Sequence, residues 1–464
     1  MQYLFQVKYI ELFAGCGGLS LGLKANGFKL VFANELGEMA AKTFSNNLIT
    51  NAEDKVVYLK HNKSLKNTKT GSVFVGSIDI LMELINSGKI DPKLLKADLI
   101  SGGPPCQGFS MAGLRKDGVN KNKLPFYFLD LVEVVSPKTV LIENVVGILH
   151  PFTSSGASIR THKEIQKRLS QLGYYSACVK IKAETFGVAE HRPRVLFLGF
   201  KKDVFESKKR YFNTFSQYYH PPYLDESVEP LDYLDLTNDD FDFINSFFKT
   251  NIPNEVTSVK EAIDDLSTNS EKSNYVNKLN TLLGQRVINR LSENEISNHE
   301  PRKHNERTTK RFKVKQVFAS DSYYSKKIDL YITQKINNFT TQDKKFISSK
   351  LRQNGFAFTH LYIFLDSIKS KKHSQKVLIP DKPSQTILTI PDDIIHYNLR
   401  ENRVLTVREE ARIQSFPDNF IFYGKPTTGG YQRELETPQY TQVGNAVPPL
   451  LAFEVGKLFK FFLK

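Results

Sequence analysis

The chain has few of the residues that mark disulfide-rich or membrane-spanning proteins. Its 464 residues include only three cysteines, Cys16, Cys106 and Cys178, and no C-x-x-C pair. This excludes a disulfide framework and a zinc ribbon, and it suits a reducing cytoplasm. No run of about 18 apolar residues occurs, which excludes a transmembrane helix. The start, Met1–Phe13, has one lysine and no small-residue cleavage site, so we expect no signal peptide.

The charge is unevenly distributed around a formal net value of +15. Residues 1–200 carry 25 Lys+Arg and 16 Asp+Glu, 201–300 carry 11 and 18, 301–380 carry 18 and 5, and 381–464 carry 10 of each. A concentrated basic region favours a polyanion partner, with a solvated basic face as the alternative. We therefore predict that 301–380 holds most of a nucleic-acid-binding surface and that the acidic stretch lies on the outer side.

Short β-branched or aromatic runs alternate with amphipathic stretches over the first 200 residues. We predict strands at Tyr9–Phe13, Leu30–Asn34, Asp98–Ser101, Thr139–Ile142, Ala177–Ile181 and Val195–Phe200. Helices are predicted at Leu19–Asn26, Phe126–Val135 and Ile159–Leu172. Such alternation is typical of an α/β fold with a parallel sheet and helices on both faces. Ligands of these folds bind at the carboxyl ends of the strands.

The regular alternation stops after residue 200 and order returns near residue 400. Residues 201–390 show no clear period, and we interpret them as a second, mixed domain. In the later run RVLTVREEARIQSF, Thr406 fits an N-cap and Glu409 follows three residues on, which predicts a helix with a capping box. The final run PLLAFEVGKLFKFFLK predicts a terminal amphipathic helix.

A glycine-rich loop follows the first predicted strand. Gly15 and Gly17 let the backbone turn sharply and approach a ligand. The dinucleotide fingerprint is not met, because Ser20 stands where its third glycine is required. The loop therefore suits a nucleoside without a pyrophosphate. Glu35 is placed to accept hydrogen bonds from ribose hydroxyls, although it also fits a helix N-terminal acid.

The run Asp98–Ser110 places Cys106 just beyond a strand, after a Gly-Gly-Pro-Pro lead-in. A lone cysteine is more often a packing residue, but prolines fix the chain path here and favour a nucleophile. An ordinary thiol has a pKa of about 8.5, so a nucleophile would need activation. Glu143 ends another apolar strand, where a carboxylate is either hydrogen-bonded or used as an acid.

Two arginines one residue apart open the strand near residue 195. Strand alternation predicts that Arg192 and Arg194 share a face, where guanidinium groups can bind phosphates or carbonyl oxygens. The alternative is surface charge.

Together, and in this order, these segments resemble the DNA (cytosine-5)-methyltransferase family of bacterial restriction–modification systems. The resemblance covers about 1–200 and 380–464. It rests on the runs ELFAGCGGLSLG, GGPPCQGFS, IENVVG, HRPRVLFLG, LTVREEARIQSFPD and QVGNAVPP. It implies a doubly wound α/β domain that binds S-adenosyl-L-methionine (AdoMet), and a smaller mixed target-recognition domain. The implied limits are 1–205 for the catalytic domain, 206–395 for target recognition, 396–435 for a hinge segment and 436–464 for the return to the catalytic domain.

The resemblance also implies catalytic roles for four residues. Cys106 resembles the nucleophile that attacks cytosine C6, and Glu143 resembles the acid that engages ring N3. Arg194 resembles the contact to cytosine O2, and Arg192 a neighbouring support or phosphate contact. Because C6 is unreachable inside a duplex, the target base must be flipped out. The basic run Gly108–Lys123 resembles the loop that closes over it.

Cofactor contacts are implied in the same way. Phe13 resembles the adenine-stacking residue and Glu35 the ribose-binding residue. The other positions implied to contact AdoMet are Gly15, Gly17, Gly18, Leu36, Ser77, Ile78, Pro105, Asn445 and Val447; no metal site is implied. Three departures from the family pattern stand out, and one is a central insert that is longer than in the smaller members, so that its recognition loops cannot be aligned. Ser77 occupies the usual aspartate position, so that either Ser77 or Asp79 contacts adenine. Ala189-Glu190 replaces Pro-Gln, and this carboxylate could pair with the arginines and change how they are held.

The function implied is sequence-specific transfer of a methyl group from AdoMet to cytosine C5 in double-stranded DNA. We expect a bacterial, cytoplasmic, nucleoid-associated monomer that protects host DNA alongside a cognate restriction endonuclease, without membrane contact. Three alternatives remain: a tRNA cytosine methyltransferase, a nucleic-acid-binding protein with an inactive catalytic domain, and an oxidoreductase. The long basic region argues against the first, intact Cys106 and Glu143 against the second, and the missing third glycine against the last.

Overall fold

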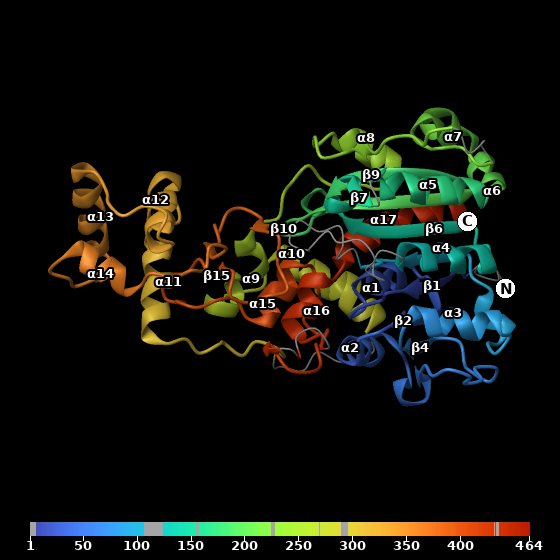
Figure 1. Ribbon diagram of the computed structural model, residues 1–464, viewed down its shortest axis with the longest axis horizontal. Helices are drawn as coiled ribbons and strands as arrows, with labels where there is room; N and C mark the ends of the chain where they lie inside the picture. The colour runs from blue at the N-terminus through green and yellow to red at the C-terminus, as the bar shows by residue number, and fades with distance from the viewer. Residues whose placement is uncertain are drawn as a thin grey trace.

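The structure, a computed structural model, describes residues 6–105, 124–154, 157–223, 228–268, 270–288, 296–430, 432 and 436–464. It consists of a body that contains a large sheet and a helical lobe at the other end of the long axis (Figure 1). Within these described residues, no helix is long and apolar enough to cross a membrane.

A nine-stranded sheet forms the centre of the body. Its strands, in spatial order, are β12 (Leu234–Asp235), β9 (Tyr174–Lys182), β11 (Pro193–Lys201), β6 (Thr139–Val145), β5 (Leu99–Gly102), β1 (Lys8–Leu12), β2 (Lys29–Glu35), β4 (Ser72–Val75) and β3 (Val56–Tyr58). All six predicted strands are confirmed, with shifted ends. A separate hairpin, β7 (Phe152–Ser154) and β8 (Ala157–Ile159), lies outside this sheet.

The prediction of a parallel sheet is wrong for one strand. β11 runs antiparallel to both β6 and β9, whereas the other neighbouring pairs are parallel. A parallel neighbour requires a crossover connection of a dozen or more residues, usually a helix. Residues 183–192, which join β9 to β11, contain only a 3-10 turn at Ala183–Phe186 and the two-residue strand β10 (Glu190–His191). The chain therefore turns back beside β9.

Helices cover both faces of the sheet, as predicted. One face packs against α1 (Gly18–Ala25), α2 (Glu38–Leu48) and α17 (Pro449–Leu463), and the other against α3 (Ile78–Asn86), α4 (Leu124–Val135) and α5 (Thr161–Gln171). The terminal helix α17 lies along α1, where Asn26 Nδ2 donates to the Phe453 carbonyl at 2.6 Å. A Cβ atom on Gly22 would overlap the Pro449 carbonyl oxygen, so the two helices require this glycine. The two ends of the chain thus share one core.

Residues 202–288 pack against the body. They form α6 (Lys202–Ser207), α7 (Lys209–Phe215), α8 (Phe241–Phe248), α9 (Val259–Thr268), α10 (Asn274–Leu279) and a π-helical turn (Asn280–Gln285). The ring of Phe205 stacks on Phe462 of α17 with centroids 5.6 Å apart, and the Tyr211 hydroxyl donates to the Phe247 carbonyl at 2.9 Å. This acidic stretch therefore belongs to the hydrophobic core that includes the sheet.

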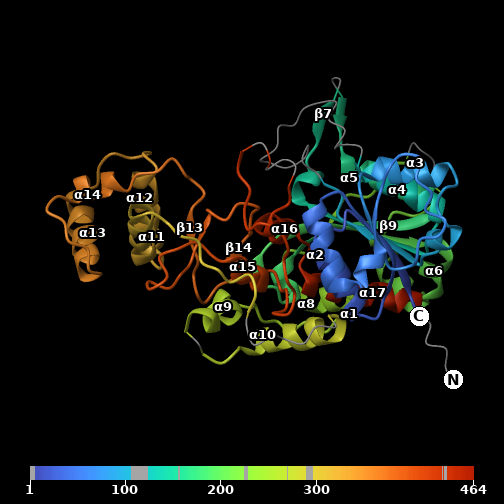
Figure 2. The ribbon, with the colours of Figure 1, turned by 90° about the horizontal axis from the view of Figure 1, so that it is seen from below.

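The lobe contains four helices with a hydrophobic core of their own. They are α11 (Glu306–Phe318), α12 (Ser322–Ile332), α13 (Thr341–Gln353) and α14 (Leu361–Ser367). Asn305, Asp321 and Thr340 cap the first three by accepting backbone N–H groups. Seen from below, α13 lies at the far end of the molecule from the sheet (Figure 2). Two-residue strands β13 (Lys376–Val377) and β15 (Ile394–Ile395) join the lobe to the body.

The segment after the lobe returns to the body through β14 (Ser384–Gln385), α15 (Val407–Ile413) and α16 (Gln439–Asn445). The predicted capping box is confirmed: the Thr406 hydroxyl accepts the Glu409 N–H at 3.2 Å, and the Glu409 carboxylate accepts the Thr406 N–H at 2.7 Å. Both residues are fully buried.

We predict that Thr406→Ala lowers the free energy of unfolding by about 1 kcal/mol, because it leaves a buried N–H of the first turn without its acceptor. Urea denaturation followed by circular dichroism measures this change. Thr406→Ser is the matched control, since it keeps the hydroxyl, and should recover most of the loss. An alanine variant as stable as the parent protein would contradict the role of the cap.

Candidate active site

The predicted site segments follow strands that end at one edge of the sheet. Leu12, the last residue of β1, lies opposite Asn34 on one side and Gly102 on the other. Gly102 in turn lies opposite Ile142 of β6. Because these strands are parallel, their carboxyl ends bring the glycine-rich loop, Glu35, the Gly-Gly-Pro-Pro lead-in and Glu143 to the same edge.

Glu143 and Arg194 form an ion pair at this edge, with Arg194 Nε 2.9 Å from Glu143 Oε1. β6 and β11 are antiparallel neighbours, and Arg194 lies opposite Val145, two residues beyond Glu143. Diagonal neighbours of this kind share a face of the sheet and are within reach of long side chains. Both residues are buried, with 9 % of Glu143 and 7 % of Arg194 exposed.

The lead-in to Cys106 is fixed next to this pair. Asn144 Nδ2 donates to the Pro104 carbonyl at 3.1 Å, while Asn144 Oδ1 accepts the Val145 N–H at 2.9 Å. A Cβ atom at Gly103 would lie 3.2 Å from Glu143 Oε2, so a larger residue there would crowd the carboxylate. Pro105 is exposed at the end of this segment. Cys106 and the run Gly108–Lys123 lie outside the described residues.

The other two cysteines are buried. Burial raises the pKa of the Cys16 thiol to about 12, and it also raises the pKa of the Cys178 thiol. Neither group is therefore suited to form a thiolate, and both serve as packing residues.

Glu35 closes the glycine-rich loop. Its Oε2 accepts the Gly15 N–H at 2.8 Å, and its Oε1 accepts the Gly37 N–H at 2.7 Å. Gly37 is the N-cap residue of α2, so the carboxylate also supports the start of that helix. Burial raises the pKa of the Glu35 carboxyl. Each oxygen keeps a lone pair that a ribose hydroxyl could use.

The residues around this loop are of the kinds that bind a nucleoside. A Cβ atom built on Gly15 meets nothing within 4 Å. Beside it, Leu36 is 69 % exposed, although it is a large apolar residue, and Phe13 is only partly buried. Apolar side chains next to a carboxylate are what a purine and its ribose require. The residues present therefore suit the nucleoside part of AdoMet.

The remaining predicted cofactor contacts come from two further segments. The Ser77 hydroxyl donates to Asp79 at the start of α3, so both alternatives for the adenine contact lie together, while Ile78 is part of the core. Asn445, the last residue of α16, is exposed, and Val447 in the turn that follows is partly buried. A Cβ atom on Gly18 would overlap the Val447 carbonyl oxygen, so this turn lies directly on the end of the glycine-rich loop, after Gly17.

Arg192 does not share the surroundings of Arg194. It is 2 % exposed, and its guanidinium donates to the carbonyls of Gly444 at 2.8 Å and Ala446 at 3.1 Å. The prediction that Arg192 and Arg194 share a face is wrong, because Arg192 lies in the break between β10 and β11, where strand alternation is interrupted. The sequence reasoning also missed Asn144, although it follows Glu143 directly.

A buried carboxyl group beneath the loop was also missed. Glu11 on β1 is 1 % exposed and accepts a hydrogen bond from the Ser20 hydroxyl, which lies 2.8 Å from the Tyr9 hydroxyl. Burial raises the pKa of Glu11 to about 8. An acid in the middle of an apolar strand was the signal in the sequence that could have revealed it.

Comparisons with known proteins agree on one family. A family model described as C-5 cytosine-specific DNA methylase matches residues 7–460. The chain is 29 % identical to the type II methyltransferase M.DdeI of Desulfomicrobium norvegicum, over 99 % of this chain and 89 % of that protein. It is also 29 % identical to the type II methyltransferase M1.HphI of Haemophilus parahaemolyticus, over 98 % of this chain and 87 % of that protein. A crystal structure of a putative prophage-encoded DNA modification methyltransferase of E. coli shares the fold, with a TM-score of 0.57, 22 % identity and 99 % coverage of both chains.

We predict that Glu11 makes the protein less stable as pH rises. Its carboxyl has a folded-state pKa of about 8, against about 4.3 when unfolded. The native state therefore holds one more proton between these values, and the free energy of unfolding falls as pH rises through that window. Glu11→Gln keeps an acceptor for Ser20 but cannot titrate. In urea denaturation, the free energy of unfolding of this variant minus that of the parent protein should rise steadily from about pH 5 to about pH 8.

The buried Val132 of α4 provides a control for this measurement, because Val132→Ala removes buried volume but no titratable group. This variant should differ from the parent protein by the same amount at every pH. A constant difference for Glu11→Gln as well would show that the Glu11 carboxyl is ionised in the native state, contrary to the prediction.

Proposed function

The chain belongs to the C-5 cytosine-specific DNA methylase family, and from this premise we propose that it methylates one cytosine within a specific sequence of duplex DNA. The observation that supports this most directly is the buried Glu143–Arg194 pair beside the fixed lead-in to Cys106. A carboxyl group and a guanidinium that lie side by side can bind N3 and O2 of the same cytosine ring, respectively.

We assign the chemistry to three residues. The Cys106 thiolate forms a bond to cytosine C6, and the electron pair of the C5–C6 double bond moves to form a C4–C5 double bond. The electron pair of the C4–N3 double bond moves to N3, which takes a proton from the Glu143 carboxyl group. Arg194 donates a hydrogen bond to O2 and holds the ring in place. Attack by the thiol makes C5 electron-rich, and this divides one difficult substitution into easier steps. After methylation, a base removes the C5 proton and the electron pair of that C–H bond expels the Cys106 thiolate.

The contacts of Glu143 support this role. Its ion pair with Arg194 keeps the carboxylate oriented toward the strand edge. When a flipped base enters, Arg194 can donate to O2 as well, since a guanidinium has five N–H groups. The base must leave the duplex to reach these groups, and the run Gly108–Lys123 is the part of the chain that we expect to close over it.

AdoMet, when bound, supplies an electrophilic methyl group. We propose that Phe13 and Leu36 contact its adenine, that Glu35 accepts hydrogen bonds from its ribose, and that Pro105 separates it from Cys106. The backbone of the loop, through Gly15, Gly17 and Gly18, allows the close approach that these contacts need. Ser77, Ile78, Asn445 and Val447 complete the proposed cofactor site.

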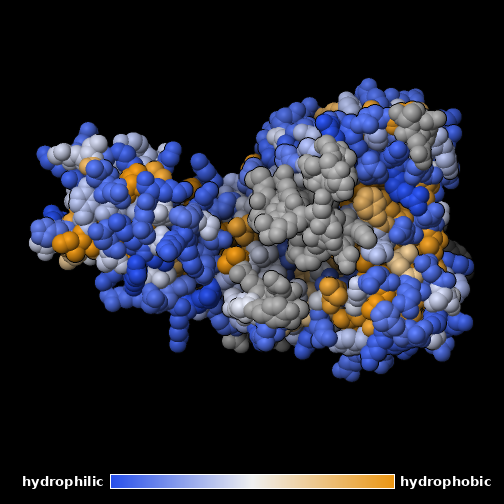
Figure 3. Space-filling view, in the orientation of Figure 1, coloured by the Kyte–Doolittle hydropathy of each residue, from blue (hydrophilic) through white to orange (hydrophobic). Residues whose placement is uncertain are grey.

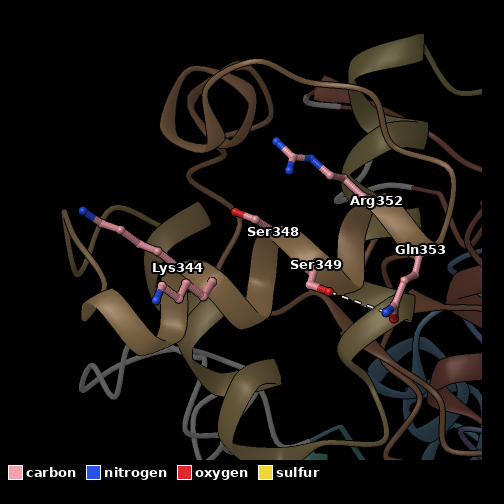
Figure 4. Close-up of a pocket in the computed structure, with 6 residues that line it drawn as sticks. Lys344, Ser348, Ser349, Arg352 and Gln353 are labelled. Atoms are coloured by element: carbon pink, nitrogen blue, oxygen red, sulfur yellow. Dashed lines mark hydrogen bonds between the residues drawn. The ribbon is translucent and has the colours of Figure 1, made fainter.

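We propose that the lobe of helices α11–α14 contributes to DNA binding. Its surface is mainly hydrophilic in the view of Figure 3. On α13, the side chains of Lys344, Lys345, Ser348, Ser349, Arg352 and Gln353 line a shallow hollow (Figure 4). This α13 stripe contains no acidic residue, whereas the neighbouring Asp343 is buried and paired with Lys327. Lys344 lies 4.9 Å from the Tyr362 ring centre and Arg352 lies 5.1 Å from that of Phe358, so neighbouring rings help to order both cations.

The biological setting follows from the relatives, which are named as type II methyltransferases. We propose that the protein acts as a monomer on DNA of the bacterial nucleoid and protects host DNA from a cognate restriction endonuclease. The two enzymes would share a recognition sequence without the need for physical contact.

We expect Cys106→Ala to abolish transfer of tritium from labelled AdoMet to duplex DNA, because no covalent adduct at C6 can form. Cys178→Ala is the matched control: it removes a buried thiol that is distant in sequence from the site and should retain transfer. Bisulfite sequencing of DNA from an expressing host identifies the methylated cytosine. Transfer by Cys106→Ala, or transfer to tRNA rather than to duplex DNA by the parent protein, would refute the proposed function.

The α13 stripe gives a separate prediction. The triple variant Lys344→Gln, Lys345→Gln and Arg352→Gln should raise the KM for DNA and flatten the dependence of log K on log [salt] by up to about 2.7, because each phosphate contact contributes about 0.9. Since α13 lies far from the sheet, kcat at saturating DNA should stay unchanged.

The control neutralises three exposed lysines of the connection between β3 and β4, Lys60, Lys66 and Lys69, in the same way. It should leave the salt dependence as it is in the parent protein. If the α13 variant and the control had equal slopes, the stripe would not contact DNA.

A further inference from the structure

Arg192 occupies the junction of three segments that are far apart in the sequence. All four N–H groups of its two terminal nitrogens have acceptors. Nη1 donates to Glu190 Oε1 at 3.1 Å and to the Ile387 carbonyl at 3.3 Å. Nη2 donates to the carbonyls of Gly444 at 2.8 Å and Ala446 at 3.1 Å. With 2 % of its surface exposed, this guanidinium is closed to DNA phosphates.

Glu190 fixes one side of this junction. It is fully buried, and its Oε1 also accepts the Ile387 N–H at 2.6 Å. The adjoining strands β10 and β14 pair with Glu190 opposite Ser384. The segment that leaves the lobe is therefore attached to the start of β11 both by backbone pairing and by this carboxylate. Glu190 stands where the family usually has glutamine, so the attachment here includes a buried charge pair.

The other side of the junction leads to the proposed cofactor site. The two carbonyls that Arg192 holds flank Asn445. The next residue after Ala446 is Val447, whose carbonyl packs against Gly18 at the start of α1. Gly444 also packs tightly on the Leu388 carbonyl, next to Ile387. The turn 444–447 is thus held between Arg192 and the glycine-rich loop.

We infer that Arg192, oriented by Glu190, is a positioning residue that couples the AdoMet site to the target-base site. The inference rests on the proposed function, because it assigns both sites to one reaction. Arg192 is two residues from Arg194, which pairs with Glu143. A displacement of the turn 444–447 is therefore transmitted to the base-binding arginine through a single intervening residue, Pro193, whose ring restricts the backbone.

The guanidinium is well suited to this task and an ammonium is not. A planar fork reaches acceptors on two segments at once, and it stays charged when buried. A lysine has a single side-chain nitrogen. It cannot donate to the two carbonyls of the turn and, at the same time, to Glu190 and the Ile387 carbonyl. Removing Arg192 would also leave the Glu190 carboxylate buried without its charged partner.

The test compares two buried arginines. Arg192→Lys should weaken binding of S-adenosylhomocysteine at least tenfold in calorimetry, and it should lower kcat at least tenfold even at saturating AdoMet and DNA, because Arg194 is displaced as well. The control is Arg408→Lys. Arg408 is also fully buried, and it donates to the carbonyls of Ser297, Pro417 and Phe420, none of which belongs to the turn 444–447. It should lose thermal stability but keep S-adenosylhomocysteine affinity within about twofold.

Two substitutions of Glu190 distinguish the loss of its charge from the loss of its hydrogen-bond acceptor. Glu190→Gln retains an oxygen for Arg192 and Ile387, so it should weaken S-adenosylhomocysteine binding less than Glu190→Ala does. Parent-like affinity of Arg192→Lys, or an equal loss in Arg408→Lys, would overturn the inference. Failure of the proposed function would look different: the parent protein would bind S-adenosylhomocysteine but transfer no tritium to DNA, and the calorimetric series would still test the coupling.

Discussion

The close packing of α17 on α1 determines where the site forms. The carbonyl oxygens of Pro449 and Val447 occupy space that side chains at Gly22 and Gly18 would otherwise fill. Because protein interiors are densely packed, any larger residue would separate the two helices or force the turn away. The turn that carries Asn445 is thereby placed on the loop that Glu35 closes. The first and last segments of a long chain thus form one binding edge.

Charge buried deep in the body has a structural role. In the segment 403–418, Arg403 pairs with Glu409, and Arg412 pairs with Asp265 and Asp418. This run contributed strongly to the family resemblance, yet its side chains point to structural partners and not to the strand edge. Removing either partner of such a pair leaves an uncompensated buried charge, which is far more destabilising than loss of a surface ion pair. Resemblance to a family can therefore identify residues that maintain the fold as readily as residues that react.

Local patterns predicted local structure well. The glycine-rich loop, the six predicted strands and the Thr406 capping box depend on neighbours within a few residues, and all are found. The strands that carry Glu143 and Arg194 were predicted, but their antiparallel pairing depends on the absence of a crossover helix. Two partners of Arg192 come from residues 195 and 252 positions away. The aromatic packing of 202–288 against α17 is equally non-local, so no sequence period could reveal it.

The chain enters the lobe before α11 and leaves it toward the short strands β13 and β15, and α11 also contacts residues 395–404. The four helices of the lobe form a separate core. Few contacts of the sheet would change if helices α11–α14 were replaced by a different set of helices. A lineage could thus acquire a different lobe by recombination at the two ends of this segment, before α11 and near β13, while keeping its catalytic machinery. Selection on the lobe and selection on the body can then proceed at different rates, and the slowly changing residues should include those, such as Glu190 and Ile387, where the returning chain meets the sheet.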